Sequence, residues 1–213
     1  MIKVVDNLEL RGNELVCRDK KGICKPITFL QGHLDGACAI YSVMMNLLIL
    51  RCINHKDTYL YTEHKNIETK NLFKILVESN GMHRDGRTFN WINLKVRESF
   101  SSIVDCTQKR TSNEDSIRLI SSCIDNNIPV IISVVSKNSA HAMLAVGYEF
   151  MNDDNLTKIF SLDPSGDLPK YSYWNSVIDL YPQQSGNIYK YNCINAFEEY
   201  RVYMDDILII NKK

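Results

Sequence analysis

The sequence predicts an α+β protein in which a buried helix packs on an antiparallel sheet. Residues 37–52 are apolar on nearly every face of a helix, which is typical of a helix inside a domain. Three later stretches, 128–135, 140–148 and 158–163, are rich in β-branched and apolar residues and are separated by turn-forming residues. This pattern predicts strands that pair as antiparallel neighbours.

The chain is expected to form one domain over residues 1–213. With 213 residues, 45% of them hydrophobic, it can bury a core without disulfides. No repeat, low-complexity tract or charge run marks a linker. We expect strands in 1–30, a mainly helical part in 31–127 and a mainly β part in 128–213.

Secondary structure within these parts follows from hydrophobic spacing and turn residues. Strands are expected at residues 2–10, 15–18, 26–30 and 103–106. Helices are expected at 67–79, ending at Asn80-Gly81, at 91–100, and from a capping box at Ser112 to about Asp125.

Charge and cysteine usage exclude several classes of protein. Lys+Arg and Asp+Glu each total 25, so the net charge is zero and no patch for nucleic acid or anionic membranes is indicated. The seven cysteines are odd in number, scattered and never spaced as Cys-x-x-Cys, which argues against a disulfide framework and a zinc site. They are Cys17, Cys24, Cys38, Cys52, Cys106, Cys123 and Cys193.

The expected compartment is a reducing cytosol. Residues 1–6 contain no apolar signal core, and the longest apolar run, 43–50, is too short to span a bilayer. A route of delivery to another cell without a Sec signal stays open, as does the oligomeric state.

Cys38 is the first candidate for chemistry, because it lies at the start of the apolar helix. Asp35 and Gly36 precede it and are suited to capping and to a sharp bend. Unpaired amides and the helix dipole lower a thiol's pKa there and can bind an oxyanion. Gln31, seven residues upstream, can direct an amide N–H₂ to the same point. The alternative is that Cys38 only fills the core, as free cysteines often do.

A base and its orienting carboxylate are predicted from the later strands. If the turn at 151–155 centres near Asp153, antiparallel pairing brings Asp163 within a residue or two of His141. Asn138 and Asp167 are weaker candidates for the third position, since one precedes the strand and the other follows the turn. A core histidine and an ordinary Asp-Pro turn are the structural alternatives.

These residues together resemble the papain-like cysteine peptidase superfamily. The matching motifs are Gln31-Gly followed by Cys38 on a helix, the Ile-Pro-Val strand from residue 128, and His141-Ala-Met-Leu-Ala-Val-Gly-Tyr. The resemblance implies a two-lobed fold, with a central helix carrying Cys38 packed against an antiparallel sheet carrying His141 and Asp163. It also implies a Cys-His-Asp triad with Gln31 in the oxyanion hole and no metal or organic cofactor.

The departures from papain itself point to particular branches of that superfamily. Cys38 lies between two alanines, the spacing from Gln31 is one residue longer, and the third residue is Asp163 before a proline. The chain is more similar to compact bacterial branches, namely exporter-associated leader peptidases and cysteine-protease effectors or toxins. The resemblance does not extend over the residues between Cys52 and Asn127.

Three functions are compatible with this pattern. The favoured one is a peptidase acting on a protein or peptide. Glutamine deamidation or transamidation of a partner protein proceeds through the same thioester, so the sequence does not separate the two. An inactive fold used as a binding module is disfavoured, because all four catalytic positions hold competent residues.

Overall fold

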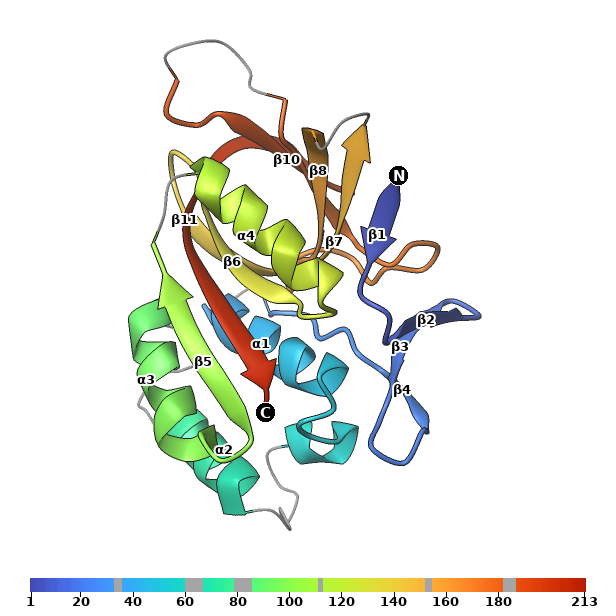
Figure 1. Ribbon diagram of the computed structural model, residues 1–213, viewed down its shortest axis with the longest axis vertical. Coiled ribbons are helices and arrows are strands. Elements are labelled where there is room, and N and C mark those ends of the chain that lie inside the picture. The colour runs from blue at the N-terminus through green and yellow to red at the C-terminus, as the bar shows by residue number, and fades with distance from the viewer. Residues whose placement is uncertain (33–35, 60–66, 79–85, 111–112, 152–154, 182–186) are drawn as a thin grey trace.

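The computed structural model describes the whole chain except residues 33–35, 60–66, 79–85, 111–112, 152–154 and 182–186 (Figure 1). The predicted α+β class is confirmed, and every strand pair is antiparallel. No described helix is both long enough and apolar enough to cross a membrane.

Six strands form a closed barrel. They are β6 (Val130–Val135), β7 (Ala140–Met151), β8 (Asn155–Leu162), β9 (Ser176–Asp179), β10 (Tyr191–Asn195) and β11 (Glu199–Lys212). The order around the ring is β7-β6-β11-β10-β9-β8, and pairing of β8 with β7 closes it. Closure removes the free edges of these six strands. The strands predicted at 128–135, 140–148 and 158–163 correspond to β6, β7 and β8, whereas β9, β10 and β11 were not located from sequence.

Five further strands lie outside the ring. β1 (Ile2–Val4) pairs with β7, and β5 (Val104–Lys109) pairs with β11. A separate sheet contains β2 (Leu8–Arg11), β3 (Glu14–Arg18) and β4 (Cys24–Pro26). The strand expected at 26–30 is wrong, because the last ladder residue is Pro26. Ile27 still donates its N–H to the Leu15 carbonyl, at 3.2 Å, and the chain then leaves the sheet toward the candidate site.

The helices divide between two faces of the molecule. They are α1 (Cys38–Ile49), the short 3-10 helix η1 (His55–Thr58), α2 (Ile67–Glu78), α3 (Phe89–Phe100) and α4 (Asn113–Asp125). Figure 1 shows α1, α2 and α3 together in the lower half and α4 against the barrel. α3 starts two residues before the predicted position because Thr88 caps it, accepting the Trp91 N–H at 3.3 Å. The predicted stop at 80–81 and the cap at Ser112 lie outside the described residues.

Helix α1 is the centre of the core and is fixed against β6 and β7. Its side chains are buried from Ala39 to Ile49 with the exception of Tyr41, as expected for a helix that is apolar all round. Two buried polar side chains bind it to the barrel. Ser42 Oγ donates to the Ala142 carbonyl at 3.4 Å, and Asn46 Nδ2 donates to the Pro129 carbonyl at 2.8 Å. These bonds fix the rotation of α1 relative to the strand that carries His141.

Candidate active site

Cys38 is the first residue of α1. The N-cap is Ala37, which makes no side-chain cap bond, so the first amides of the helix are not consumed by a capping side chain. The predicted cap Asp35 lies outside the described residues. The backbone amides of Ala39, in the helix, and Ala142, in β7, lower the pKa of the Cys38 thiol. A thiol in this position is surrounded by donors that favour its anionic form.

His141 is the second residue of β7 and lies between Cys38 and Asp163. Its Nε2 is 2.6 Å from Asp163 Oδ1, and its interaction with the Cys38 thiol raises its pKa. Because Nε2 faces the carboxylate, Nδ1 is the ring nitrogen left for the sulfur. Leu144 pairs with Leu162 across the β7–β8 ladder, so Asp163 follows at the level of residue 143, two positions from His141. The structure therefore brings three of the four predicted residues together, with His141 hydrogen-bonded to Asp163 and interacting with Cys38.

The pKa values of the pair are shifted toward the charged forms. Burial raises the pKa of the Cys38 thiol, but the hydrogen bond and charge of His141 outweigh it, and the net pKa is lowered. Burial lowers the pKa of His141, and the bonds to Asp163 and Cys38 reverse this and raise it to about 10. Both shifts favour the pair of thiolate and imidazolium over the pair of neutral groups.

The other cysteines provide a contrast. All seven are described and none forms a disulfide. Burial raises the pKa of five of them, to about 11 for Cys17 and Cys52, to about 12 for Cys106, and upward for Cys123 and Cys193. Cys38, in contrast to these five, has both a lowered thiol pKa and a histidine partner.

Asp163 is held in place by a network that the sequence did not reveal. It is 3% exposed, and its Oδ1 accepts the Ser165 N–H at 2.7 Å in addition to the bond from His141. Asn175 Oδ1 accepts the Asp163 N–H at 2.6 Å, and its Nδ2 donates to the carbonyls of Asp163 and Asp167, both at 2.8 Å. The Asx-type turn at Asp163-Pro-Ser could have been predicted locally. The contact of Asn175 could not, because it comes from the segment leading into β9.

Gln31 lies against the same turn. Its backbone N–H donates to the Pro164 carbonyl at 2.7 Å, and its Oε1 accepts from Ser165 Oγ at 3.3 Å. Because the side-chain oxygen of Gln31 faces Ser165, its side-chain NH₂ group points away from Ser165. The residue expected to hold an oxyanion is thereby coupled through Ser165 to the residue expected to orient the base.

The weaker candidates for the third position are engaged elsewhere. Asn138 lies in the turn between β6 and β7, where its N–H donates to Ser136 Oγ at 3.4 Å. The carbonyl of Asp167 accepts from Asn175. Within the described part of the chain, Asp163 is the carboxylate bonded to the His141 ring.

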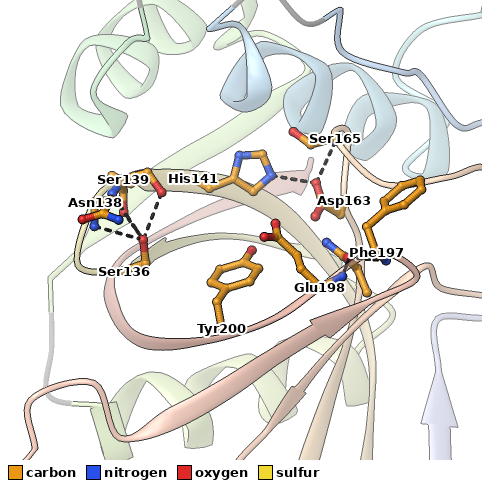
Figure 2. A pocket seen from close by; sticks show the side chains of 11 residues that line it. Ser136, Asn138, Ser139, His141, Asp163, Ser165, Phe197, Glu198 and Tyr200 are labelled. Atoms are coloured by element: carbon orange, nitrogen blue, oxygen red, sulfur yellow. Dashed lines mark hydrogen bonds and ion pairs between the residues drawn. The ribbon is translucent and has the colours of Figure 1, made fainter.

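Two hollows meet at His141. The first, here called the Cys38 hollow, has a volume of about 580 Å³ and is lined by Cys38, Ala39, residues 86–90, Gln108, Arg110, Ser133, residues 140–142, Asp205 and Asp206. The second, here called the Glu198 hollow, has a volume of about 400 Å³ and is shown in Figure 2. It is lined by Ser136, residues 138–141, Asp163, Ser165, Asn195, Phe197, Glu198 and Tyr200. His141 therefore borders both hollows.

Comparisons with known proteins do not assign the chain to a family. No family model matches the chain, and no curated protein matches it. Among solved structures, the crystal structure of UfSP from C. elegans matches with 14% identity and a TM-score of 0.48, over 100% of this chain and 34% of that chain. This chain thus spans about a third of that protein's length. At this identity and TM-score the likeness does not decide the function of the chain.

Proposed function

We propose that the chain is a papain-like cysteine peptidase that cleaves a protein or peptide substrate. The observation that carries the proposal is the grouping of Cys38, His141 and Asp163. His141 is hydrogen-bonded to Asp163 and shares a hollow with Cys38, whose thiol lies at a helix N-terminus and has a lowered pKa. In this proposal, the helices α1 to α3 correspond to one lobe and the barrel to the other. The resemblance of the motifs around Gln31, Cys38 and His141 supports the same assignment.

The proposed reaction begins with attack of the Cys38 thiolate on a substrate carbonyl carbon. A C–S bond forms, and the carbonyl electrons move to the oxygen, which the Cys38 N–H and the Gln31 amide stabilise. As the tetrahedral intermediate collapses, the C–N bond breaks and His141 gives its proton to the leaving amine. Water then attacks the thioester with His141 as base, which releases a carboxylic acid and the free thiol.

Asp163 contributes by orienting His141 and supporting its positive charge. The 2.6 Å bond from Nε2 to Oδ1 fixes the ring with Nδ1 toward the thiol. At 1% exposure of its side chain, the carboxylate is screened from water, which strengthens its effect on the imidazolium. Gln31 would stabilise the negative charge on the carbonyl oxygen, which exists only in the transition state.

Mass spectrometry of a mixture of unfolded protein substrates tests this proposal. Active enzyme is expected to produce broken chains with new termini, and Cys38→Ala is expected to produce none. A gain of about one dalton at glutamine without chain cleavage identifies deamidation, and cross-linked products identify transamidation. Either result, or cleavage that persists in Cys38→Ala, contradicts the proposed peptidase.

The physiological substrate and the bacterial setting stay predictions from the sequence. A Cys38→Ala variant keeps the cleft and removes the nucleophile, so it is suited to trapping a bound substrate. Proteins retained by this variant and then cut by the active enzyme are the expected substrates. Leader peptides and proteins of another cell are the two classes that the resemblance favours.

A further inference from the structure

The tip of the β10–β11 hairpin is held in a fixed shape beside His141. Asn195 Oδ1 accepts the N–H groups of Phe197 and Glu198, at 2.9 and 3.0 Å. The Asn195 N–H in turn donates to the Glu198 carbonyl at 3.1 Å. An asparagine that satisfies its own turn in this way fixes the backbone from which the next side chains extend.

Two side chains from this tip reach the Glu198 hollow, together with Tyr200 from β11. Figure 2 shows the Glu198 carboxylate and the Tyr200 hydroxyl pointing toward His141, with the Phe197 ring at the edge near Asp163. Phe197 is 69% exposed, so its ring contributes little to the core and is available to a ligand. The hollow therefore combines one carboxylate with two aromatic rings.

The charge of the Glu198 carboxylate is not balanced locally. No Lys or Arg is among the described residues that line the hollow, and the described part of the chain provides no ion pair to this carboxylate. The charge of His141 is already matched by Asp163, at 2.6 Å, and by the Cys38 thiolate. A hollow with an excess negative charge and aromatic walls is suited to a cationic side chain.

The position of the hollow indicates which half of a substrate it contacts. Cys38 lines the Cys38 hollow and does not line the Glu198 hollow, whereas His141 lines both. During the proposed reaction the acyl half stays on Cys38, and the leaving half departs with the proton from His141. The leaving amine takes its proton at Nδ1, beside Cys38, and a leaving half that then extends past the ring away from Cys38 reaches the Glu198 hollow.

We propose that the Glu198 hollow binds a lysine or arginine side chain in the leaving half of a polypeptide substrate. Glu198 is the anionic partner, and the rings of Phe197 and Tyr200 form the walls. This inference rests on the proposed peptidase function and specifies its substrate class. It assigns Glu198 to specificity and gives it no part in bond cleavage.

The first experiment uses a peptide library prepared by cutting a proteome after acidic residues, so that Lys and Arg occur at internal positions. Mass spectrometry of the products of the wild-type enzyme gives the residues on both sides of each new cut. We expect Lys and Arg to be enriched at the first two positions after the cut. Enrichment only before the cut, or none at all, overturns the inference while leaving the peptidase in place.

The second experiment measures kcat/KM on one cleaved peptide made with arginine or with citrulline, which has the same shape and no charge. Wild-type enzyme is expected to prefer arginine by about 10-fold or more, as for a hydrogen-bonded charge pair. In Glu198→Gln the ratio is expected to fall to about 1, and Glu198→Lys is expected to favour a glutamate peptide. The control Glu14→Gln changes an exposed glutamate on β3 and should keep the arginine preference.

The outcomes separate this inference from the function on which it rests. Because Glu198 is exposed, its variants should fold, which thermal unfolding verifies. An arginine preference that survives in Glu198→Gln refutes the role of Glu198 and leaves the peptidase intact. A wild-type enzyme that cuts no peptide in the library refutes the proposed function, and this inference with it.

Discussion

Replacement of Asn175 by alanine tests how the fold holds the candidate triad. The change removes the three hydrogen bonds that Asn175 makes to the backbone at Asp163 and Asp167. Asp167 is exposed, so water can replace one of them. The Asp163 N–H belongs to a residue that is 3% exposed, and it loses its partner. The Asp163 carbonyl keeps the Gly166 N–H, at 3.2 Å.

The expected cost follows mainly from this one buried N–H group. An unsatisfied backbone group costs about 1–3 kcal/mol, so we expect Asn175→Ala to lower the free energy of unfolding by about that amount. For a chain of this length that corresponds to a decrease in Tm of about 2–12 °C.

The effect on chemistry distinguishes a positioning role from a purely structural one. A displaced Asp163 supports His141 less, so the raised pKa of His141 should fall and the lowered pKa of Cys38 should rise. The midpoint of the pH dependence of Cys38 alkylation should move to higher pH, and kcat/KM should fall by about 10²-fold. Iodoacetamide labelling at a series of pH values, followed by peptide mapping, measures the alkylation midpoint of Cys38.

A matched control keeps this test specific. Asn126 is exposed and directly follows α4, and Asn126→Ala removes one side-chain bond, from Nδ2 to the Ser122 carbonyl at 2.8 Å. It should leave the alkylation profile of Cys38 unchanged. Asn175→Ala with a wild-type alkylation midpoint and wild-type kcat/KM refutes the reasoning, whatever its effect on stability.

Further predictions concern the four proposed catalytic residues themselves. Cys38→Ala and His141→Ala should each abolish peptide cleavage, with a stability change of at most about 1–2 kcal/mol for Cys38→Ala; full activity in either rules out the triad. Gln31→Ala should lower kcat by about 10²–10³-fold with little change in substrate binding, and a change in KM alone would contradict its oxyanion role. Asp163→Asn should retain partial activity, since an amide oxygen can accept the same bond, and Asp163→Ala should lose more; equal activities contradict this. The pH dependence of kcat/KM should be bell-shaped. Its acid limb should lie below the ordinary Cys pKa, since Cys38 is lowered, and its basic limb above the ordinary His pKa, since His141 is raised to about 10; a basic limb near pH 6.5 contradicts the pairing.

The parts of the fold that the sequence predicted are those with local signals. The apolar run of α1 and the β7–β8 hairpin each depend on residues close together in the chain. The β7–β8 ladder has two register shifts that cancel, so Leu144 faces Leu162 as it would in an unbroken ladder from Met151 and Asn155. This is why the nearness of Asp163 to His141 could be anticipated. The geometry establishes the contact between Asp163 and His141, whereas the catalytic use of that contact is proposed.

The remaining parts depend on contacts between residues that are distant in the sequence. β11 is the longest described strand and pairs with β5, β6 and β10, which no local pattern indicates. β5 and α4 fall within the part predicted as mainly helical, although both pack against the barrel. Ser42, Ser165 and Asn175 look like ordinary helix or loop residues in the sequence, and their roles follow only from the strands and turns that they contact.

The most direct test of the central claim is the order in which the seven cysteines react. Wild-type protein and His141→Ala are treated briefly with iodoacetamide at about pH 6, and the labelled cysteines are identified by peptide mapping. We expect Cys38 to be labelled first in the wild type, because its lowered pKa leaves thiolate where the other buried thiols are protonated. In His141→Ala the effect of burial on the thiol pKa is opposed only by the backbone amides of Ala39 and Ala142, which are the smallest of the causes, so this rapid labelling should disappear. Another cysteine labelled first, or rapid labelling of Cys38 that persists without His141, would contradict the proposed catalytic pair.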